Sequence, residues 1–342
     1  MEFRLAFIGF GNVAQAFARI IIDRRDHLAE DCDLGLKTTA IATANHGCIV
    51  SNDGIDLTEA VACIESGRPL TKLNNSLAVL DTSALIDVCE ADILFETTPL
   101  NPISGEPAAS YIRSALTRGI DVVTANKGPL AFAYRELKSL ASHHRATFRF
   151  EGTVMDGTPI FNLVESCLPG VLVLGFSGVL NSTTNLILTG MESGRSFEQC
   201  LAEAQRIGIA ETNADYDIDG WDAAVKAVAI ANVIMDADLR PADVKREGIR
   251  GIAYDALRAA TASGMAVRLV ARGRRTYPGV ALTVAPEMVP AASVLGSVCH
   301  TSNALILETD LMGEIAMVET NPGVNQTAYA LLSDMLSIMR ET

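Results

Sequence analysis

The segment at residues 3–14 reads FRLAFIGFGNVA, and it predicts how the first half of the chain folds. The apolar run 3–8 predicts a buried strand, and the apolar residues at helical spacing that follow predict a helix. Between them, GxGxxA fits the dinucleotide fingerprint: Gly9 permits a tight turn, Gly11 lets a pyrophosphate approach the backbone, and Ala14 allows close helix–strand packing. The anion would lie on the positive end of the helix. The alternative is a purely structural glycine turn.

A second strand is predicted at 36–43, and its end bears on the choice of cofactor. In NAD-binding proteins this end usually offers an acid to the ribose hydroxyls. Here the strand runs into Thr43-Ala44-Asn45-His46-Gly47, with neither an acid nor an arginine. NAD and NADP are therefore both compatible with the sequence, although the missing acid removes repulsion against a 2′-phosphate.

Polar residues follow two further predicted strands. The strand 91–96 ends at Thr97-Thr98-Pro99, and the strand 120–124 is followed by Lys127. Because the carboxyl ends of parallel strands face the ligand crevice, these hydroxyls and this lysine are candidate ligand contacts. The alternatives are an ST-turn before the proline and a lysine in a solvated loop.

The pattern changes after residue 130, which predicts a second domain. Helices are predicted at 160–167, 197–207 and 253–263, after an interrupted helical region at 53–90 in the first half. A strand is predicted at 172–180. Four further strands, predicted at 267–272, 280–286, 303–309 and 313–320, read as an antiparallel extension of a mixed sheet.

Five consecutive amide and hydroxyl side chains, Asn181-Ser182-Thr183-Thr184-Asn185, follow the predicted strand 172–180. They precede a helix predicted at 186–193. Such side chains can cap a helix or contact a small polar substrate, and the two uses can coexist.

The stretch 208–226, GIAETNADYDIDGWDAAVK, concentrates acidic residues before a single lysine. The helix predicted from Gly220 onward places Asp222 and Lys226 four residues apart on one face. Geometry alone favours an ordinary surface ion pair, which contributes roughly 0.2–0.5 kcal/mol. The alternative is a proton-handling site.

The composition limits the classes of partner. A net charge of −14, with 27 basic residues, argues against nucleic acid. No apolar run reaches the roughly 18 residues that span a bilayer, and no signal peptide is evident, so we expect a cytoplasmic protein without a membrane partner. The cysteines form no CxxC or Cys/His cluster and are expected to be reduced; they are Cys32, Cys48, Cys63, Cys89, Cys167, Cys200 and Cys299.

Taken together, these segments resemble the homoserine dehydrogenase family over nearly the whole length of the chain. Order, spacing and identity match in GFGNVA (9–14), ETTPLN (96–101), TANKGPLA (124–131), EGTVMDGTPI (151–160), GVLNSTTNLIL (178–188), the stretch 208–226 and NPGVNQTAYALLSD (321–334). The resemblance implies a short form without the kinase domain or the C-terminal regulatory domain that many members carry.

The resemblance also implies a fold and an activity. The expected fold is α/β, with a Rossmann dinucleotide-binding domain at 1–130 that the C-terminal helix 321–342 completes. An α+β substrate-binding and dimerisation domain with a mixed sheet is expected at 131–320, and the protein is expected to be a homodimer. The implied reaction is NAD(P)-dependent hydride transfer that interconverts L-homoserine and L-aspartate 4-semialdehyde, a step in threonine, methionine and isoleucine biosynthesis.

Site residues carry over position by position. Lys226 and Lys127 would handle the proton on the substrate oxygen, Lys226 being favoured by a neighbouring cation that disfavours its ammonium form. The substrate would be held by Glu211, Asp217, Asp222 and Thr183, with Asp222 also counted among the catalytic residues. The cofactor contacts would be Gly9, Gly11, Asn12, Val13, Thr97, Thr98, Lys127 and Gly323. A monovalent cation, Na+ or K+, would be bound at Glu151, Val154, Asp156 and Thr158.

The chain also departs from the family pattern. The family usually has EPDPxDD where this chain has ETNADYD at 211–217, so that Asn213 and Tyr216 replace two acids. This difference supports an alternative, a reductase for another small amino-acid aldehyde. A further alternative, from another class, is a cofactor-sensing protein that has lost catalysis.

Overall fold

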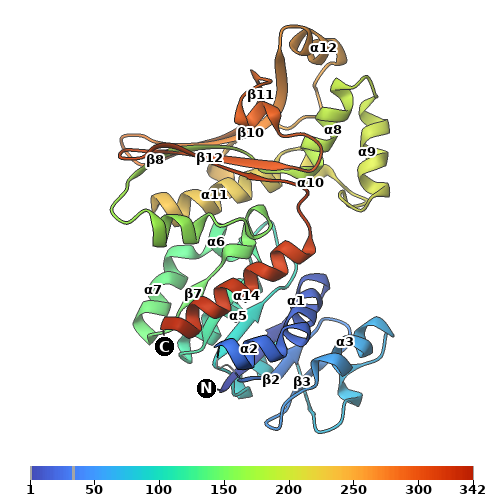
Figure 1. Cartoon of the computed structure of the whole chain (residues 1–342), viewed down its shortest axis with the longest axis vertical. Helices are drawn as coiled ribbons and strands as arrows, with labels where there is room; N and C mark the ends of the chain where they lie inside the picture. Colours follow the sequence, from blue (N-terminus) through green and yellow to red (C-terminus); the bar gives the residue numbers. More distant parts are fainter. Residues whose placement is uncertain (1, 33–34, 342) are drawn as a thin grey trace. The chain divides into compact units, whose positions relative to one another are not determined.

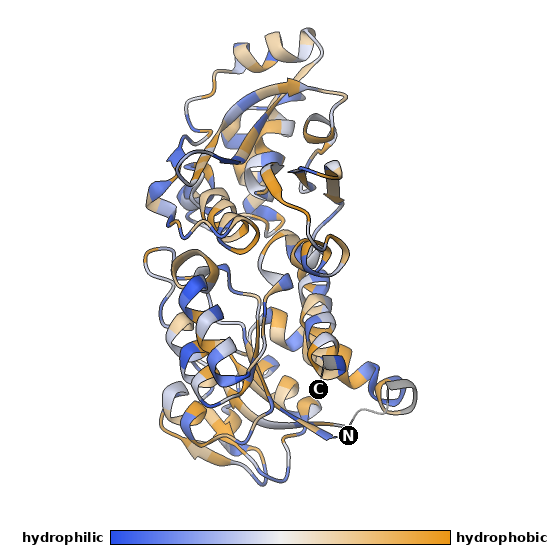
Figure 2. Cartoon of the chain, turned by 90° about the vertical axis from the view of Figure 1, so that its left-hand side faces the viewer, coloured by the Kyte–Doolittle hydropathy of each residue, from blue (hydrophilic) through white to orange (hydrophobic). Residues whose placement is uncertain are grey.

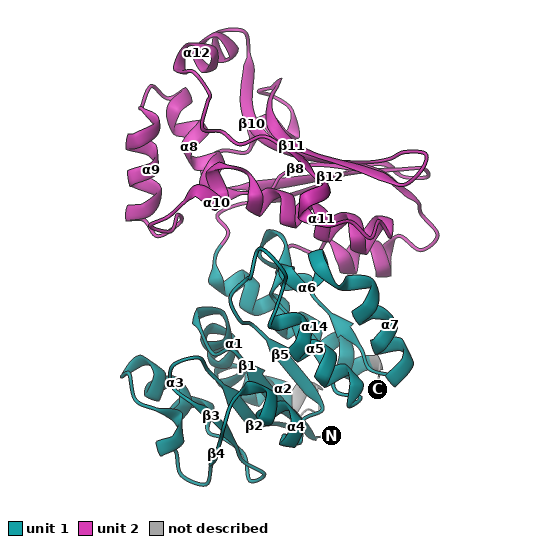
Figure 3. Ribbon diagram, turned by 180° about the vertical axis from the view of Figure 1, so that it is seen from behind, with its two compact units in different colours: residues 1–157, 323–342 teal, residues 158–322 magenta. Residues whose placement is uncertain are grey.

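The computed structural model describes residues 2–32 and 35–341 of the chain. The chain forms two compact units (Figure 3). Unit 1 comprises residues 1–157 and 323–342, and unit 2 comprises residues 158–322. Unit 1 is therefore built from both ends of the sequence.

Unit 1 contains one seven-stranded sheet with helices on both faces (Figure 1). Its strands are β1 (Glu2–Ile8), β2 (Gly35–Ala42), β3 (Cys48–Val50), β4 (Leu77–Val79), β5 (Ile93–Glu96), β6 (Asp121–Thr124) and β7 (Phe148–Arg149). Its helices are α1 (Asn12–Asp23), α2 (Arg25–Cys32), α3 (Leu57–Glu65), α4 (Thr82–Val88), α5 (Ala108–Thr117), α6 (Lys127–Phe132), α7 (Tyr134–His144) and α14 (Val324–Glu341). Short turns of 3-10 helix lie at Leu70–Lys72, Glu151–Thr153 and Met155–Gly157.

The strand order β4-β3-β2-β1-β5-β6-β7 is that of a Rossmann-type sheet with a short antiparallel edge. β2, β1, β5, β6 and β7 run parallel, and β3 and β4 add antiparallel pairs at one side. The chain leaves β1 for β2 on one side and later returns to β5 on the other. This reversal is the topological switch point, where open α/β sheets bind ligands.

Two apolar cores hold helices against the two faces of this sheet. On one face, Phe7, Phe17 and Phe95 pack with ring centroids 4.7–5.9 Å apart. Apolar residues of α14, such as Leu331 and Met335, join this core, and Figure 1 shows α14 in red beside α1 in blue. The other face is covered by α4, α5 and α7. Figure 2 shows hydrophobic residues on the helices as well as on the strands, as expected when both contribute to the cores.

Unit 2 contains a six-stranded mixed sheet in the order β13-β12-β8-β10-β11-β9. Its neighbouring strands pair antiparallel, except for β11 and β9, which run parallel. The strands are β8 (Val173–Val179), β9 (Lys245–Arg246), β10 (Met265–Arg275), β11 (Val280–Pro290), β12 (Asn303–Thr309) and β13 (Gly313–Glu319). The helices are α8 (Ser182–Glu192), α9 (Phe197–Arg206), α10 (Asp215–Ile218), α11 (Trp221–Met235), α12 (Tyr254–Ala262) and α13 (Val294–Ser297), with short turns at Leu163–Cys167 and Pro241–Asp243.

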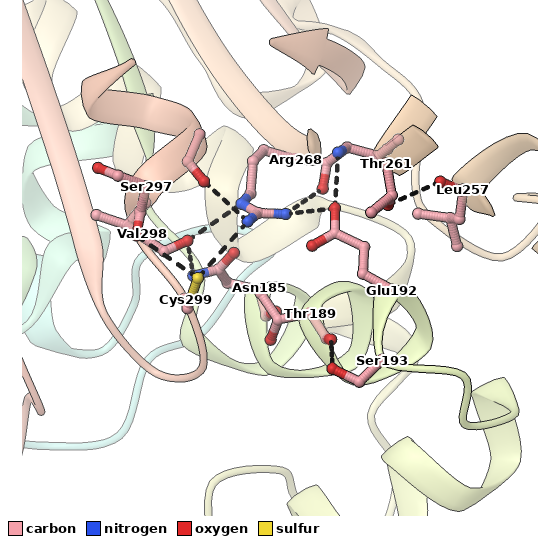
Figure 4. Close-up of polar contacts among 12 residues, drawn as sticks. Asn185, Thr189, Glu192, Ser193, Leu257, Thr261, Arg268, Ser297, Val298 and Cys299 are labelled. Atoms are coloured by element: carbon pink, nitrogen blue, oxygen red, sulfur yellow. Dashed lines mark hydrogen bonds and ion pairs between the residues drawn. The ribbon is translucent and has the colours of Figure 1, made fainter. Parts of the chain in front are cut away.

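A buried arginine ties the helices of unit 2 to its sheet (Figure 4). Arg268 of β10 is 1% exposed, and its Nη1 lies 2.8 Å from Oε1 of Glu192 at the end of α8. Its guanidinium also donates to the carbonyls of Gly296 and Val298. Asn185 of α8 donates to the Val298 carbonyl as well. These bonds satisfy a charge that would otherwise be costly to bury.

Several elements differ from those expected from the sequence. β4 lies within the region 53–90 that reads as helical, and β3 lies just before that region, where no element was predicted. Each has three residues and is defined by pairing at the sheet edge, so its sequence shows no periodicity. The second-half strands, by contrast, form the mixed sheet that was expected for the second domain. The predicted helix 160–167 is a single π-helical turn at Leu163–Cys167, ended by Pro169, which disfavours helical backbone at the residue before it.

The boundary between the units, after Gly157, lies beyond residue 130. β7 pairs with β6, and α7 packs on α5, so both elements belong to unit 1.

Within the described part of the chain, none of the helices is long and apolar enough to cross a membrane. Six cysteines are free thiols: Cys48, Cys63, Cys89, Cys167, Cys200 and Cys299. The side chain of Cys32 lies outside the described residues.

Candidate active site

In unit 1 the glycine turn between β1 and α1 packs directly against the segment that follows β5. Gly9 has a φ of +84°, and a Cβ added there would lie 2.8 Å from the carbonyl carbon and oxygen of Thr97. The Thr97 hydroxyl donates to the Gly9 carbonyl over 2.9 Å. Only glycine fits at this position, because it alone lacks the Cβ and tolerates the positive φ.

The start of α1 is open. Gly11 is its N-cap and offers no side-chain cap, and a Cβ added to Gly11 would meet no described atom within 4 Å. Asn12 is exposed and Val13 is half-buried. Backbone N–H groups at the N-terminus of a 12-residue helix, with space before them, are suited to bind a phosphate. The geometry therefore fits the pyrophosphate of a dinucleotide.

A buried carboxylate shapes the loop after β5. Glu96 is fully buried and accepts hydrogen bonds from the Thr98 backbone N–H (2.8 Å), from the Thr98 hydroxyl, and from the Thr124 hydroxyl (2.7 Å). Asn126 donates to the Thr98 carbonyl and caps α6 through Gly128. The threonine hydroxyls predicted as ligand contacts are thus engaged within unit 1, and Lys127 is the first residue of α6.

The buried carboxyl group of Glu96 is expected to make the stability of the fold depend on pH. Burial raises the pKa of Glu96 above its ordinary value of 4.5, against hydrogen bonds that lower it. The pKa of Glu96 is therefore higher in the folded protein than in the unfolded chain. For this reason the contribution of Glu96 to folding stability is fully present below the unfolded pKa and is lost as pH rises through the folded pKa. We expect Glu96→Gln to weaken the fall in urea midpoint that the parent shows above pH 4.5. The exposed Glu59→Gln is the control, and an unchanged pH slope in Glu96→Gln would contradict the assignment.

A cavity of about 580 Å³ in unit 1 lies at the opposite end of the strands. Its lining includes Glu2, Gly35 and Lys37, at the amino ends of β1 and β2. Ligands of open parallel sheets bind at the carboxyl ends. This cavity is therefore not the cofactor site.

In unit 2 the predicted acid–base pair is buried. Lys226 Nζ lies 3.2 Å from Asp222 Oδ2 and donates to the Leu180 carbonyl over 2.7 Å. The side chains of Lys226 and Asp222 are 15% and 10% exposed. The interpretation as a surface ion pair is therefore wrong, because α11 turns this face toward the end of β8 and the start of α8.

Asn181 joins the two central carboxylates. Its Nδ2 donates to Asp217 Oδ1 (2.8 Å) and to Asp222 Oδ2 (3.0 Å), while its Oδ1 caps α8 at Thr184. Burial, followed by the charge of Asp222, raises the pKa of Asp217, against the hydrogen bonds from Asn181 and Thr183 and the charge of Lys226. Asn181 lies within the polar cluster noted in the sequence, but its bridging role was not predicted, because it depends on a contact 36 and 41 residues away.

The other predicted substrate residues of unit 2 lie at different depths. Thr183 is buried and donates to the Ile209 carbonyl over 3.3 Å. Glu211 is exposed in the loop before α10. The polar cluster at 181–185 begins α8 four residues earlier than the helix predicted at 186, since Asn181 is the N-cap.

A segment that sequence reasoning missed holds the turn between α10 and α11. A Cβ at Gly248 would lie 2.3 Å from the Ile218 carbonyl oxygen, and Ile249 donates to that oxygen. Arg246 stacks 3.8 Å from the Trp221 ring, and Arg250 pairs with Asp219. The segment therefore fixes the backbone that connects Asp217 to Asp222. A spacing of two arginines around a glycine carries no recognisable signal.

The residues predicted to bind a cation lie in the segment where the chain passes from unit 1 to unit 2. Glu151 and Val154 are buried in unit 1, and Asp156 has a φ of +43° between Met155 and Gly157, which also have positive φ. Thr158 is the first residue of unit 2, and Gly323 precedes α14 in unit 1. Among the described residues, no group of three or more His, Cys, Asp and Glu side chains could hold a metal.

Comparison with known proteins identifies the family. Residues 159–336 match the family model described as homoserine dehydrogenase, and residues 9–151 match the one described as homoserine dehydrogenase, NAD binding domain. The chain belongs to the homoserine dehydrogenase family. Homoserine dehydrogenases are NAD(P)-dependent oxidoreductases, and the chain is one: it interconverts L-homoserine and L-aspartate 4-semialdehyde by hydride transfer.

Individual relatives match over nearly their full length. The homoserine dehydrogenase of Methanocaldococcus jannaschii is 37% identical, covering 99% of each chain. The NAD(+)-dependent homoserine dehydrogenase of Pseudomonas canavaninivorans is 34% identical, covering 98% of this chain and 96% of that protein. Among solved structures, the putative homoserine dehydrogenase of Archaeoglobus fulgidus superposes with a TM-score of 0.87 at 32% identity, covering 98% and 99% of the two chains. A hyperthermophilic archaeal homoserine dehydrogenase in complex with NADPH has a TM-score of 0.85 at 29% identity and covers 100% and 99%.

Proposed function

We propose that the buried cluster of unit 2 is the substrate and proton-handling site of this homoserine dehydrogenase. The observation that carries the proposal is the Asp222–Lys226 pair, which Asn181 links to Asp217. Oxidation of the alcohol must remove a proton from its oxygen, and reduction of the aldehyde must supply one. Lys226 is the group we assign to that proton, and Lys127 of unit 1 is the second basic residue assigned to the substrate oxygen.

Asp222 has a positioning role in this proposal and also borders the substrate. It holds Lys226 Nζ at 3.2 Å, while the Leu180 carbonyl accepts a second hydrogen bond from the same ammonium group. These two contacts fix the position of the ammonium group that would meet the substrate oxygen. Asp217 and Glu211 would bind the substrate's own ammonium group, with Thr183 beside them. Half-burial of Asp217 strengthens such an interaction, because water screens it less.

The cofactor is assigned to unit 1. The glycine turn and the open start of α1 would hold the pyrophosphate; the full set of proposed contacts is Gly9, Gly11, Asn12, Val13, Thr97, Thr98, Lys127 and Gly323. When bound, the nicotinamide dinucleotide exchanges the hydride. Relatives include an NAD(+)-dependent enzyme and an NADPH complex. Since the loop after β2 has no acid, we expect turnover with both NAD and NADP.

Three finer assignments complete the proposal. A Na+ or K+ ion would bind at Glu151, Val154, Asp156 and Thr158, since hard cations take oxygen ligands and this tight loop carries backbone carbonyls. The protein would be a homodimer built on unit 2. Its location would be cytoplasmic, in keeping with the free thiols of the described cysteines.

The test is the change in absorbance of the reduced nicotinamide with purified protein and L-homoserine. Parallel reactions contain NAD or NADP, and each is run with Na+, with K+ and with neither ion. We expect turnover with both cofactors and a dependence on the ion. Absence of turnover under all conditions would favour a cofactor sensor, and faster turnover of a homoserine analogue would favour a different aldehyde substrate. The mass of the particle in solution tests the dimer.

A further inference from the structure

One polar group beside the proposed substrate site has no partner in the protein. Tyr216 lies on the short helix α10, directly before Asp217. Its hydroxyl is buried and makes no hydrogen bond to any described residue. A buried polar group without a partner costs free energy, and such groups are rare in folded proteins. The hydroxyl therefore calls for a partner that the chain itself does not provide.

The surroundings of this hydroxyl are negative. Burial raises the pKa of Tyr216, and the charges of Asp222 and Asp217 raise it further. The phenol thus stays neutral at working pH and can both accept and donate a hydrogen bond. A negatively charged ligand group would be repelled here by two carboxylates, whereas a cationic group would be attracted.

The charge balance of the cluster also favours a cation. When ionised, Asp217 and Asp222 carry two negative charges and Lys226 one positive charge. The neighbouring acids Asp215 and Asp219 are instead paired with Arg250 in an exposed position. The phenol therefore has two carboxylates as charged neighbours, and these attract a cationic ligand group.

We propose that the Tyr216 hydroxyl accepts a hydrogen bond from the substrate's α-ammonium group, together with Asp217, and so selects amino-acid substrates over analogues that lack the amine. This inference rests on the proposed function of the same cluster. It gives a role to a residue at which the chain departs from the acidic family pattern. A neutral acceptor in place of a third acid satisfies one ammonium N–H without adding a further buried charge.

Tyr216→Phe tests the proposal, since it removes only the oxygen. Loss of a hydrogen bond to a charged group predicts a rise in the KM for L-homoserine of about 10- to 100-fold, with kcat at saturation largely retained. The inhibition constant of 4-hydroxybutanoate, which is homoserine without its amine, is expected to stay unchanged. The midpoint of thermal unfolding is expected to stay equal or to rise, because an unpartnered buried hydroxyl has been removed.

The control is Tyr277→Phe, a fully exposed tyrosine of the same unit. A double-mutant cycle with Asp217→Asn adds a second readout: if both groups bind one ammonium, their effects on KM will not be additive. The proposal is overturned if Tyr216→Phe leaves KM unchanged. It is also overturned if the inhibition constant of 4-hydroxybutanoate rises as much as the KM for L-homoserine. A rise in KM together with a lower unfolding midpoint would overturn it as well. The proposed function is tested separately, because it depends on whether the parent protein turns over L-homoserine and not on the behaviour of the Tyr216 variant.

Discussion

Lys226→Ala is expected to lower kcat for homoserine oxidation by about 10²- to 10⁴-fold, the usual contribution of a general acid–base group. The physical reason is the loss of the group that exchanges the proton of the substrate oxygen. Steady-state kinetics with saturating cofactor measure the effect. Replacement of the exposed Lys245 by alanine in the same unit is the matched control and is expected to leave kcat unchanged.

Alanine at 226 also leaves Asp222 buried without its cation, which costs about 3–5 kcal/mol of stability in comparable buried pairs. Lys226→Arg separates the two effects. A guanidinium keeps the positive charge for Asp222 but does not release its proton near neutral pH. We expect its kcat to fall by about 10²-fold or more with the unfolding midpoint retained. An arginine variant with near-parental kcat would exclude the proton role of Lys226.

Gly9→Ala is expected to raise the dissociation constant of the cofactor by at least about tenfold and to lower stability. A φ of +84° costs a residue with a Cβ about 1–2 kcal/mol. The new Cβ would also lie 2.8–2.9 Å from backbone atoms of Thr97 and Thr98, and such overpacking costs about 1–3 kcal/mol. Backbone on both sides must shift, so the start of α1 moves away from the loop after β5. Cofactor titration and thermal unfolding measure the two effects.

Gly11→Ala is the matched variant. Its Cβ meets no described atom within 4 Å and its φ is negative, so the free protein should keep its stability. The same methyl group stands where the pyrophosphate would approach, and cofactor affinity should fall. Parental cofactor affinity in both variants would contradict the placement of the pyrophosphate on this turn.

The local sequence was sufficient to predict an element wherever neighbouring residues determine its structure. The glycine turn between β1 and α1 is an example, since the strand, the turn and the helix follow one another within residues 2–23. The cap at Asn181 was recognisable for the same reason, although the helix starts at Ser182. The edge strands β3 and β4 were missed because pairing with β2, and not their own pattern, defines them.

The site depended on contacts that span the chain. The burial of Asp222 and Lys226, the bridge from Asn181 to Asp217, and the support of Gly248 under Ile218 each join residues distant in sequence. On spacing alone, Asp222 and Lys226 were indistinguishable from a solvated pair. The unpartnered hydroxyl of Tyr216 was likewise invisible, because partners and burial are properties of the folded chain.

By itself, the sequence determined the α/β class, the cofactor turn at 9–14, the position of α11 and the family to which the motifs belong. These follow from local propensity, periodicity and residue spacing, which are fixed before the chain folds. Only the tertiary structure decided that residues 131–157 belong to unit 1 and that the acid–base pair is buried. The physical reason is that burial and hydrogen-bond partners arise from packing between segments far apart in the sequence.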